Sequence, residues 1–343
     1  MAGANLSERR TGLFLFRWFD NESEHPDDGR DPDQIDWLRV IPFILMHLGC
    51  LGIFWFGFSS AAILVAFGLY LIRMFAITAF YHRYFSHRSF KTHRIVQFFF
   101  ALLGTASIQR GPLWWAAHHR AHHAHADRPK DPHSPRQQGF LNSHMGWFLS
   151  RSHFKTRKDL VRDWLCYPEL VFLDRYDTLI ALLLGVSLFG LGSALASFAP
   201  ELHTNGPQML FWGFFVSTIV LYHATFTVNS LAHVWGTRRY ATPDDSRNNL
   251  FLALITLGEG WHNNHHHYPG ATRQGFFWWE IDPTYWILKL MAYLGLIWDL
   301  RTVPKHWRTR NRVDQKQSAC HRHEEAFRDQ PSSSNSPDVP QDF

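Results

Sequence analysis

Four apolar runs, arranged as two pairs, constrain the fold of this chain more than any other feature. The first pair occupies residues 40–58 and 61–81, and the second occupies residues 178–198 and 208–228. A bilayer core of about 30 Å is crossed by roughly 20 residues of α-helix, so each run is long enough to span it. Because the loop within each pair is short, the sequence predicts an all-α integral membrane protein with four transmembrane helices in two hairpins.

Basic residues lie on one side of these predicted helices. Of the 34 Lys and Arg residues, only Arg73 falls inside a predicted span, and neither hairpin loop contains one. Cytoplasmic loops of membrane proteins carry the excess of Lys and Arg. We therefore expect both termini and the long segment between the hairpins to be cytoplasmic. The net charge of +5 follows from this asymmetry and does not call for a nucleic-acid partner.

The other segments complete the predicted domain organisation. Residues 1–36 are polar and are expected to form an N-terminal tail, residues 37–305 form one membrane-embedded domain, and residues 306–343 are expected to be a disordered C-terminal tail. The apolar run 95–108 is too short to span and is expected to lie at the interface or in the core. A soluble α-helical protein is disfavoured, because four runs of spanning length coincide with one-sided charge.

Histidine is abundant, with 23 residues, and much of it is clustered. An HxxxxH motif occurs at His82–His87, and HxxHH motifs occur at His119–His123 and His262–His266. Positions i, i+3 and i+4 of an α-helix share one face, so each HxxHH is expected to present three imidazoles to one point. His82 and His87 are five residues apart, which predicts that they serve different metals or that the helix unwinds between them.

A fourth histidine-bearing element begins where the last predicted span ends. Asn229 and His233 form an i, i+4 pair that reaches the same membrane surface as the three motifs. Neutral imidazole binds Fe, Zn, Cu and Ni, so residue type alone does not choose the metal. Nine histidines exceed the ligand number of one ion, which predicts a cap that holds two metal ions. The isolated histidines are interpreted as ordinary core or surface residues: His47, His93, His144, His153, His203 and His223.

The sequence between the histidine motifs is also distinctive. It includes DPHSP at Asp131–Pro135, SHMGW at Ser143–Trp147, NSLAH at Asn229–His233 and GEGWHNNHH at Gly258–His266. Over residues 77–301 the sequence resembles the membrane fatty-acid desaturases of the delta-9, acyl-CoA desaturase-like branch. This resemblance implies a di-iron centre without bridging carboxylates in a cytoplasmic histidine-rich cap. The implied iron ligands are His82, His87, His119, His122, His123, His233, His262, His265 and His266, with Asn229 reaching one iron through water.

The resemblance further implies an activity and its co-substrates. Such an enzyme uses O2 to introduce a cis double bond, at delta-9, into a saturated fatty-acyl chain. We expect the electrons to come from a separate protein such as a ferredoxin, cytochrome b5 or another reductase, since no segment resembling cytochrome b5 is visible in the sequence. The sequence leaves chain length and oligomeric state open.

The position of the double bond must be set by a bent apolar tunnel, because an alkyl chain offers no polar group near the reacting carbons. Four residues flank the metal-binding segments and are candidate tunnel walls: Trp114, Trp115, Thr225 and Phe226. Aromatic residues at a membrane interface are also common without any role in substrate binding.

The sequence departs from the animal acyl-CoA enzymes just before the second motif. Ala117 and His118 occupy the positions of an Arg-Asp pair whose Arg helps to hold CoA in those enzymes. The preceding GPLWW at Gly111–Trp115 is more similar to bacterial and plant delta-9 enzymes, some of which act on lipid-bound chains. The acyl carrier therefore stays open between CoA and a membrane lipid, and the bacterial type predicts a bacterial inner membrane.

Two other functions fit parts of the pattern. A di-iron membrane hydroxylase acting on an alkyl or lipid substrate would share the histidine motifs but would yield an alcohol instead of an alkene. A zinc transporter or histidine-rich metal-binding membrane protein would carry His and Asp within the spans. The predicted spans contain only His47 and His223, which favours the desaturase.

Overall fold

The computed structural model describes residues 19–22 and 31–313 of the 343-residue chain. Most of the predicted N-terminal tail, residues 1–36, and of the predicted C-terminal tail, residues 306–343, lies outside the described residues. The described part is mostly helical.

Four helices are long and apolar enough to cross a membrane, which confirms the predicted number of spans. They occupy Trp37–Phe56, Ser60–Ser86, Asp177–Phe198 and Gly206–Val234. The second and fourth helices continue five and six residues past the predicted ends at residues 81 and 228. These continuations carry His82 and His233, so the spans themselves deliver two of the histidine-bearing segments.

Three of the four spans change helical geometry along their length. The first joins α2 (Trp37–Gly49), the 3-10 turn η1 (Cys50–Gly52) and α3 (Ile53–Phe56). The second joins α4 (Ser60–Phe75) to the π-helix η2 (Ala76–Ser86). The fourth joins α10 (Gly206–Leu210), the π-helix η7 (Phe211–Val216), α11 (Ser217–Asn229) and α12 (Leu231–Val234). The third span is the single α-helix α9 (Asp177–Phe198).

Shorter elements build the rest of the described chain. The helices are α5 (Arg94–Thr105), α6 (Pro112–His125), α7 (Pro135–Gln138), α8 (Pro168–Arg175), α13 (Leu250–Ile255), α14 (His262–His267), α15 (Pro283–Tyr293) and α16 (Lys305–Thr309). The π-helix η3 (Asn142–Gly146) and the 3-10 turns η4 (Trp147–Leu149), η5 (Lys158–Leu160) and η6 (Pro200–Leu202) lie between them. The strands β1 (Lys91–Thr92) and β2 (Ile297–Trp298) form one short antiparallel pair.

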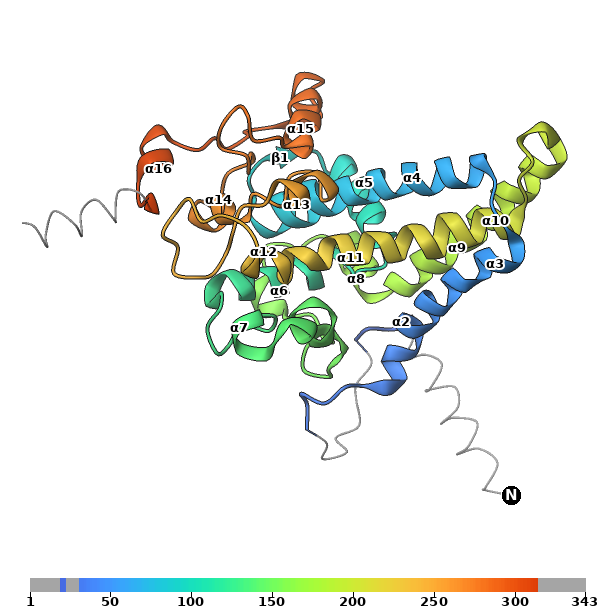
Figure 1. Cartoon of the computed structure of the whole chain (residues 1–343), viewed down its shortest axis with the longest axis horizontal. Helices are drawn as coiled ribbons and strands as arrows, with labels where there is room; N and C mark the ends of the chain where they lie inside the picture. Colours follow the sequence, from blue (N-terminus) through green and yellow to red (C-terminus); the bar gives the residue numbers. More distant parts are fainter. Residues whose placement is uncertain (1–18, 23–30, 314–343) are drawn as a thin grey trace, which may run out of the picture.

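The spans and the histidine-bearing segments lie at opposite ends of the molecule. Figure 1 shows α3, α4, α9 and α10 extending to one side, while α6, α12, α13 and α14 gather at the other. The basic residue of the second span, Arg73, is buried and donates to the hydroxyls of Ser217 (2.7 Å) and Thr218 (2.8 Å) on α11. Its charge is thus kept from lipid and ties the second span to the fourth.

Candidate metal centre

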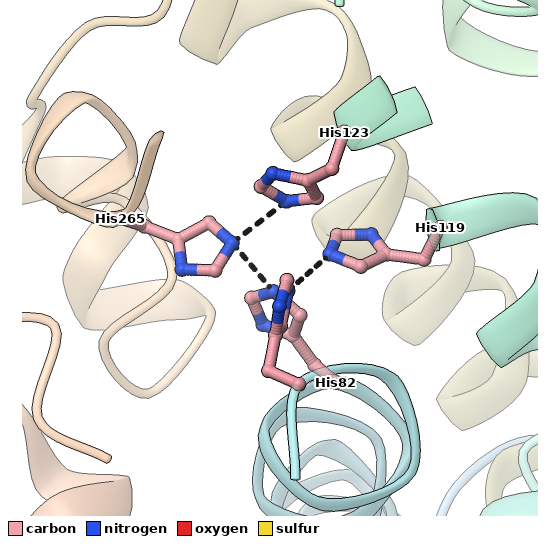
Figure 2. Close-up of side chains that lie close together, drawn as sticks. His82, His119, His123 and His265 are labelled. Atoms are coloured by element: carbon pink, nitrogen blue, oxygen red, sulfur yellow. Dashed lines mark hydrogen bonds between the residues drawn. The ribbon is translucent and has the colours of Figure 1, made fainter. Parts of the chain in front are cut away.

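The nine histidines singled out from the sequence lie in two neighbouring clusters. The first, the five-histidine cluster, contains His82, His87, His119, His123 and His265, and the second, the four-histidine cluster, contains His122, His233, His262 and His266. Within each cluster the potential ligand nitrogens lie within 4.8 Å of one another. Figure 2 shows four rings of the first cluster pointing toward a common centre.

Contacts between the Nε2 atoms show how closely the rings converge. In the five-histidine cluster, His265 Nε2 lies 3.0 Å from His82 Nε2 and 2.9 Å from His123 Nε2. In the four-histidine cluster, His233 Nε2 lies 3.0 Å from His262 Nε2. Imidazole nitrogens gathered around one point are suitable ligands for a first-row transition metal.

Each HxxHH motif is divided between the two clusters, so the expectation that its three imidazoles meet at one point is wrong. An α-helix turns about 100° per residue, so i and i+4 differ by about 40° while i+3 lies about 60° to the other side. Accordingly His119 and His123 join the five-histidine cluster, while His122 joins the four-histidine cluster. In the second motif His262 and His266 join the four-histidine cluster, while His265 joins the five-histidine cluster. Each motif therefore serves both clusters.

The HxxxxH motif lies at the end of a π-helix, not on an α-helix: His82 belongs to η2, and His87 directly follows it. His82 and His87 belong to the same cluster, so the expectation that they serve different metals is wrong. The expectation of a local departure from α-helix holds, because η2 is π-helical and the His87 N–H donates to the His82 carbonyl five residues earlier (3.3 Å). A π-helix places residues five apart on one face, which brings both rings to one point.

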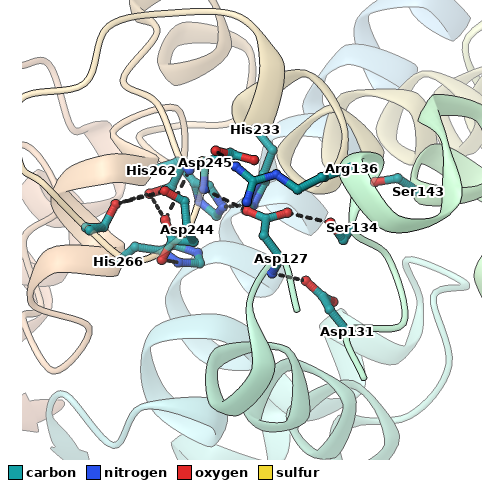
Figure 3. A network of polar contacts seen from close by, with 12 residues as sticks. Asp127, Asp131, Ser134, Arg136, Ser143, His233, Asp244, Asp245, His262 and His266 are labelled. Atoms are coloured by element: carbon teal, nitrogen blue, oxygen red, sulfur yellow. Dashed lines mark hydrogen bonds and ion pairs between the residues drawn. The ribbon is translucent and has the colours of Figure 1, made fainter. Parts of the chain in front are cut away.

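Carboxylates form a layer around the histidines that the sequence did not reveal. The Nδ1 atoms of His122, His233 and His266 lie 3.0, 2.8 and 3.0 Å from carboxylate oxygens, and the Nδ1 of His82 contacts a fourth carboxylate. His122 faces Asp131, His233 faces Asp127, His266 faces Asp244 and His82 faces Glu259. Figure 3 shows three of these carboxylates beside the four-histidine cluster. A carboxylate that accepts from Nδ1–H fixes the tautomer and leaves Nε2 free for a metal.

The protonation states of the site suit metal binding. Burial, reinforced by the neighbouring imidazoles, holds the pKa of five of the histidines well below its usual range: His87, His119, His123, His262 and His265. Burial also lowers the pKa of His266 to about 4, against the opposing effect of Asp244. These rings are neutral at pH 7 and keep a lone pair to donate.

The acidic partners stay ionised. Burial alone would raise the pKa of Asp127 and Asp244, but their histidine partners outweigh it and hold the pKa of both carboxyls well below its usual range. Each carboxylate therefore remains an acceptor for the Nδ1–H group that faces it.

Two buried nitrogens of the four-histidine cluster point to a missing partner. His122 Nε2 and His266 Nε2 are buried and have no hydrogen-bond partner. Buried polar atoms are normally satisfied, and a bound metal ion would satisfy both. Asp131 and His133 form a further possible metal group with His122, but His122 Nδ1 already faces Asp131 there.

Asn229, which the resemblance places near one metal through water, lines the cavity beside these clusters. Its backbone carbonyl accepts a hydrogen bond from Ser143 Oγ (2.8 Å).

A cavity of about 520 Å³ connects the two clusters to the membrane spans. At its inner end it is lined by His82 and His119 of the five-histidine cluster and by His122 and His262 of the four-histidine cluster. All four residues predicted from the sequence as tunnel walls line it: Trp114, Trp115, Thr225 and Phe226. Most of the other lining residues are apolar, and the largest share of these comes from α2.

One wall of the cavity has a strained backbone. Ile108 and Arg110 have positive φ angles of 59° and 70°. Residues other than glycine rarely adopt this region, and β-branched residues such as Ile108 adopt it least. The Tyr222 hydroxyl donates to the Ile108 carbonyl (2.5 Å), and Gln109 Nε2 donates to Thr225 Oγ1 (2.7 Å). These bonds hold the strained segment against α11 and fix Thr225 in the wall.

Comparisons with known proteins match these features. The family model for fatty acid desaturases matches residues 55–295. An sn-2 palmitoyl-lipid 9-desaturase of Nostoc sp. (strain 36) is 38% identical over 276 residues, covering 79% of this chain and 92% of the relative. An sn-1 stearoyl-lipid 9-desaturase of Anabaena variabilis is 37% identical, with 79% and 96% covered. An acyl-CoA C20 Delta5-desaturase of Anemone leveillei is 37% identical, with 71% and 75% covered.

Proposed function

The chain belongs to the fatty acid desaturase family, and we propose that it introduces a delta-9 double bond into an acyl chain carried by a membrane glycerolipid. As a family member it is an oxidoreductase that desaturates fatty-acyl chains. The double-bond position and the lipid carrier are the parts that need support. One observation carries the proposal: a single apolar cavity reaches both histidine clusters.

The cavity suits a hydrocarbon chain held beside two metal ions. Trp114 and Phe226 are buried and, with Trp115, offer aromatic surface next to the clusters. Such a wall excludes water and leaves the chain with dispersion contacts alone. The distance from the carrier to the reacting carbons is then set by the length and bend of the cavity, as regioselectivity requires.

We propose that the two clusters each hold one iron ion. The supporting observations are nine histidines that converge at two points, neutral imidazoles, and two buried Nε2 atoms without partners. Bound iron would supply the activation of O2 that oxidation of an alkyl chain needs. The protein holds four of the nine Nε2 atoms in place through the opposite ring nitrogen: Asp127, Asp131, Asp244 and Glu259 accept from the Nδ1 side and keep those rings from rotating. Metal analysis of protein purified without added metal tests the choice of iron over zinc.

A glycerolipid carrier is favoured over CoA for two reasons. The two relatives from Nostoc and Anabaena, whose lengths are 92% and 96% covered, are named as lipid desaturases. The chain also has Ala117 and His118 in place of the Arg-Asp pair expected of animal acyl-CoA enzymes. His118 lines the cavity, and burial lowers its pKa to about 3, so at pH 7 it carries no positive charge to replace that of the Arg.

The charge pattern supports an orientation of the enzyme in its membrane. Four apolar helices make the chain a membrane protein, and we propose that both termini and the clusters face the cytoplasm of a bacterial cell, where a separate reductant supplies electrons. The support is the absence of Lys and Arg from both hairpin loops. Reporter fusions after Phe343 test this, and an active periplasmic reporter would contradict it.

The deciding experiment is product analysis with defined substrates. Purified enzyme with a working electron donor is given a stearoyl glycerolipid and, separately, stearoyl-CoA. We expect a cis-9 double bond in the glycerolipid and little conversion of the CoA ester. Conversion of the CoA ester alone would contradict the carrier, and an alcohol product would contradict desaturation.

A further inference from the structure

The cavity has two regions away from the metal clusters, and they differ in chemistry. One region is polar and is lined by Asn21, Arg39 and Arg110. The other is apolar and lies between α2 and α9, where Leu45 and Leu182 line it. The contacts around the two regions differ, and this difference bears on the route by which a substrate enters.

Protein covers the polar region. Asn21 is buried, its backbone N–H donates to the Arg175 carbonyl (3.0 Å), and its side-chain amide donates to the Asp174 carbonyl (2.9 Å). Its Oδ1 accepts from Arg110 (2.9 Å). The adjacent Asp20 accepts two hydrogen bonds from the Arg175 guanidinium (2.9 and 2.6 Å). The segment 19–22 is therefore docked across this end by a set of polar contacts.

The apolar region faces the lipid. Leu45 and Leu182 line the cavity, yet they are 52% and 49% exposed. Both belong to candidate membrane spans, so their exposed faces meet hydrocarbon. They lie eight residues into α2 and five residues into α9, or about 12 and 8 Å along each helix at about 1.5 Å per residue. Both positions fall in the half of a bilayer of about 30 Å that is nearer the clusters.

The packing of the first span confines this gap to that half. Further along, Gly49 and Gly52 lie against the rings of Phe215 and Phe211, and a Cβ at either glycine would come within 2.1 Å of the ring. The first span is thus held tightly to η7 at this point. Before it, residues 40–46 supply part of the cavity lining instead. Leu45 therefore lies in the stretch of α2 just before the glycines that hold this span against η7.

We propose that the gap between α2 and α9 is a lateral portal through which one acyl chain of a membrane glycerolipid passes from the bilayer into the cavity. This inference rests on the proposed function and specifies the route of its substrate. The chain moves from one hydrocarbon environment to another, whereas each methylene exposed to water on an aqueous route would cost about 0.8 kcal/mol. The glycerol and the second acyl chain stay in the membrane.

Bulky substitutions at the portal test the proposal. The double variant Leu45→Trp, Leu182→Trp places two indoles in the gap, and we expect conversion of a stearoyl glycerolipid in proteoliposomes to fall by at least about tenfold, or about 1.4 kcal/mol. The matched control is Leu48→Trp, Leu183→Trp. These leucines lie on the same two helices and are similarly exposed, at 54% and 53%, but do not line the cavity. The control is expected to keep wild-type conversion.

A second pair of substitutions separates a portal from ordinary packing. Leu45→Ala with Leu182→Ala widens the gap, so conversion is expected to be retained, whereas a purely structural role for these leucines predicts a loss. Iron content, measured in every variant, reports folding. Equal conversion by the portal and control Trp variants would overturn the portal, as would loss of activity in the Ala variant with iron retained. If the wild type makes no alkene from any glycerolipid, the proposed function fails instead, so the two failures are distinguishable.

Discussion

The two histidine clusters are neighbours built from the same side chain, yet the protein holds them by different means. In the four-histidine cluster, three rings are fixed by ionised aspartates. In the five-histidine cluster, within the described residues, one carboxylate, Glu259, contacts a ring. Two other rings there take their positions from helices: His87 directly follows the π-helix η2, and His119 lies on α6. One cluster is thus oriented mainly by charge and the other mainly by backbone geometry.

This difference has a physical consequence. A ring oriented by one carboxylate can be released by changing a single side chain, whereas a ring oriented by helix geometry depends on the fold around it. The five-histidine cluster is also supported indirectly by buried ion pairs. Glu259, which contacts His82, pairs with Arg83, and Arg83 also pairs with Asp282. Substitutions in the two regions should therefore affect metal binding and stability to different extents.

The largest effect is expected from removing one ligand of each cluster. His265→Ala and His262→Ala should each abolish desaturation, because either change leaves one metal ion under-coordinated, and each variant should retain about one of the two metal ions. Metal content and product formation measure this. His93→Ala, a change just before α5 and outside both clusters, is the control and should stay active. Loss of both ions in either single variant would show that the clusters do not bind independently.

Removing the buried arginine should cost mainly stability. Arg83→Met leaves Glu259 and Asp282 as buried carboxylates without their cation, which costs about 3–5 kcal/mol. Thermal unfolding in detergent should show a large decrease for this variant. The matched change Arg94→Met removes an exposed ion pair with Glu169 and should leave the unfolding temperature nearly unchanged. Similar unfolding temperatures for the two variants would contradict the support assigned to Arg83.

A smaller effect is expected from neutralising the carboxylates around the rings. Asp127→Asn and Asp244→Asn keep the shape but weaken the acceptor for Nδ1–H, which typically lowers metal affinity by about 10–100-fold. Competition with a chelator would measure the loss, which should fall on one ion only. Asp159→Asn, at an exposed position, is the control. Equal loss of both ions would contradict the assignment of these aspartates to the four-histidine cluster.

The smallest effect concerns histidines that do not converge. His47, His144 and His223 form a hydrogen-bonded string in which His223 contacts one neighbour through each ring nitrogen (3.2 and 3.0 Å). Such a string offers no common point for an ion. His223→Phe should leave metal content unchanged and destabilise the protein by about 0.5–1.5 kcal/mol for each lost hydrogen bond. A decrease in metal content in this variant would show that the string contributes to the centre.

The sequence by itself determined the features that depend on neighbouring residues. Hydropathy over about 20 residues identified the four spans, since crossing a bilayer is a property of one continuous segment. Motif spacing and density identified the nine histidines now found in two clusters. The residues around these motifs were enough to identify the family. Trp114, Trp115, Thr225 and Phe226 followed from their adjacency to the motifs, and all four line the cavity.

Only the tertiary structure decided which cluster each histidine joins and what holds it there. The division of each HxxHH motif depends on where the second motif lies in space. His82 and His87 share a cluster because packing stabilises a π-helix that no spacing rule predicts. The partners His233 and Asp127 are 106 residues apart, and His82 and Glu259 are 177 residues apart (259 − 82). Contacts over such separations leave no periodic signal in the sequence, because they are created by the folding of the chain as a whole.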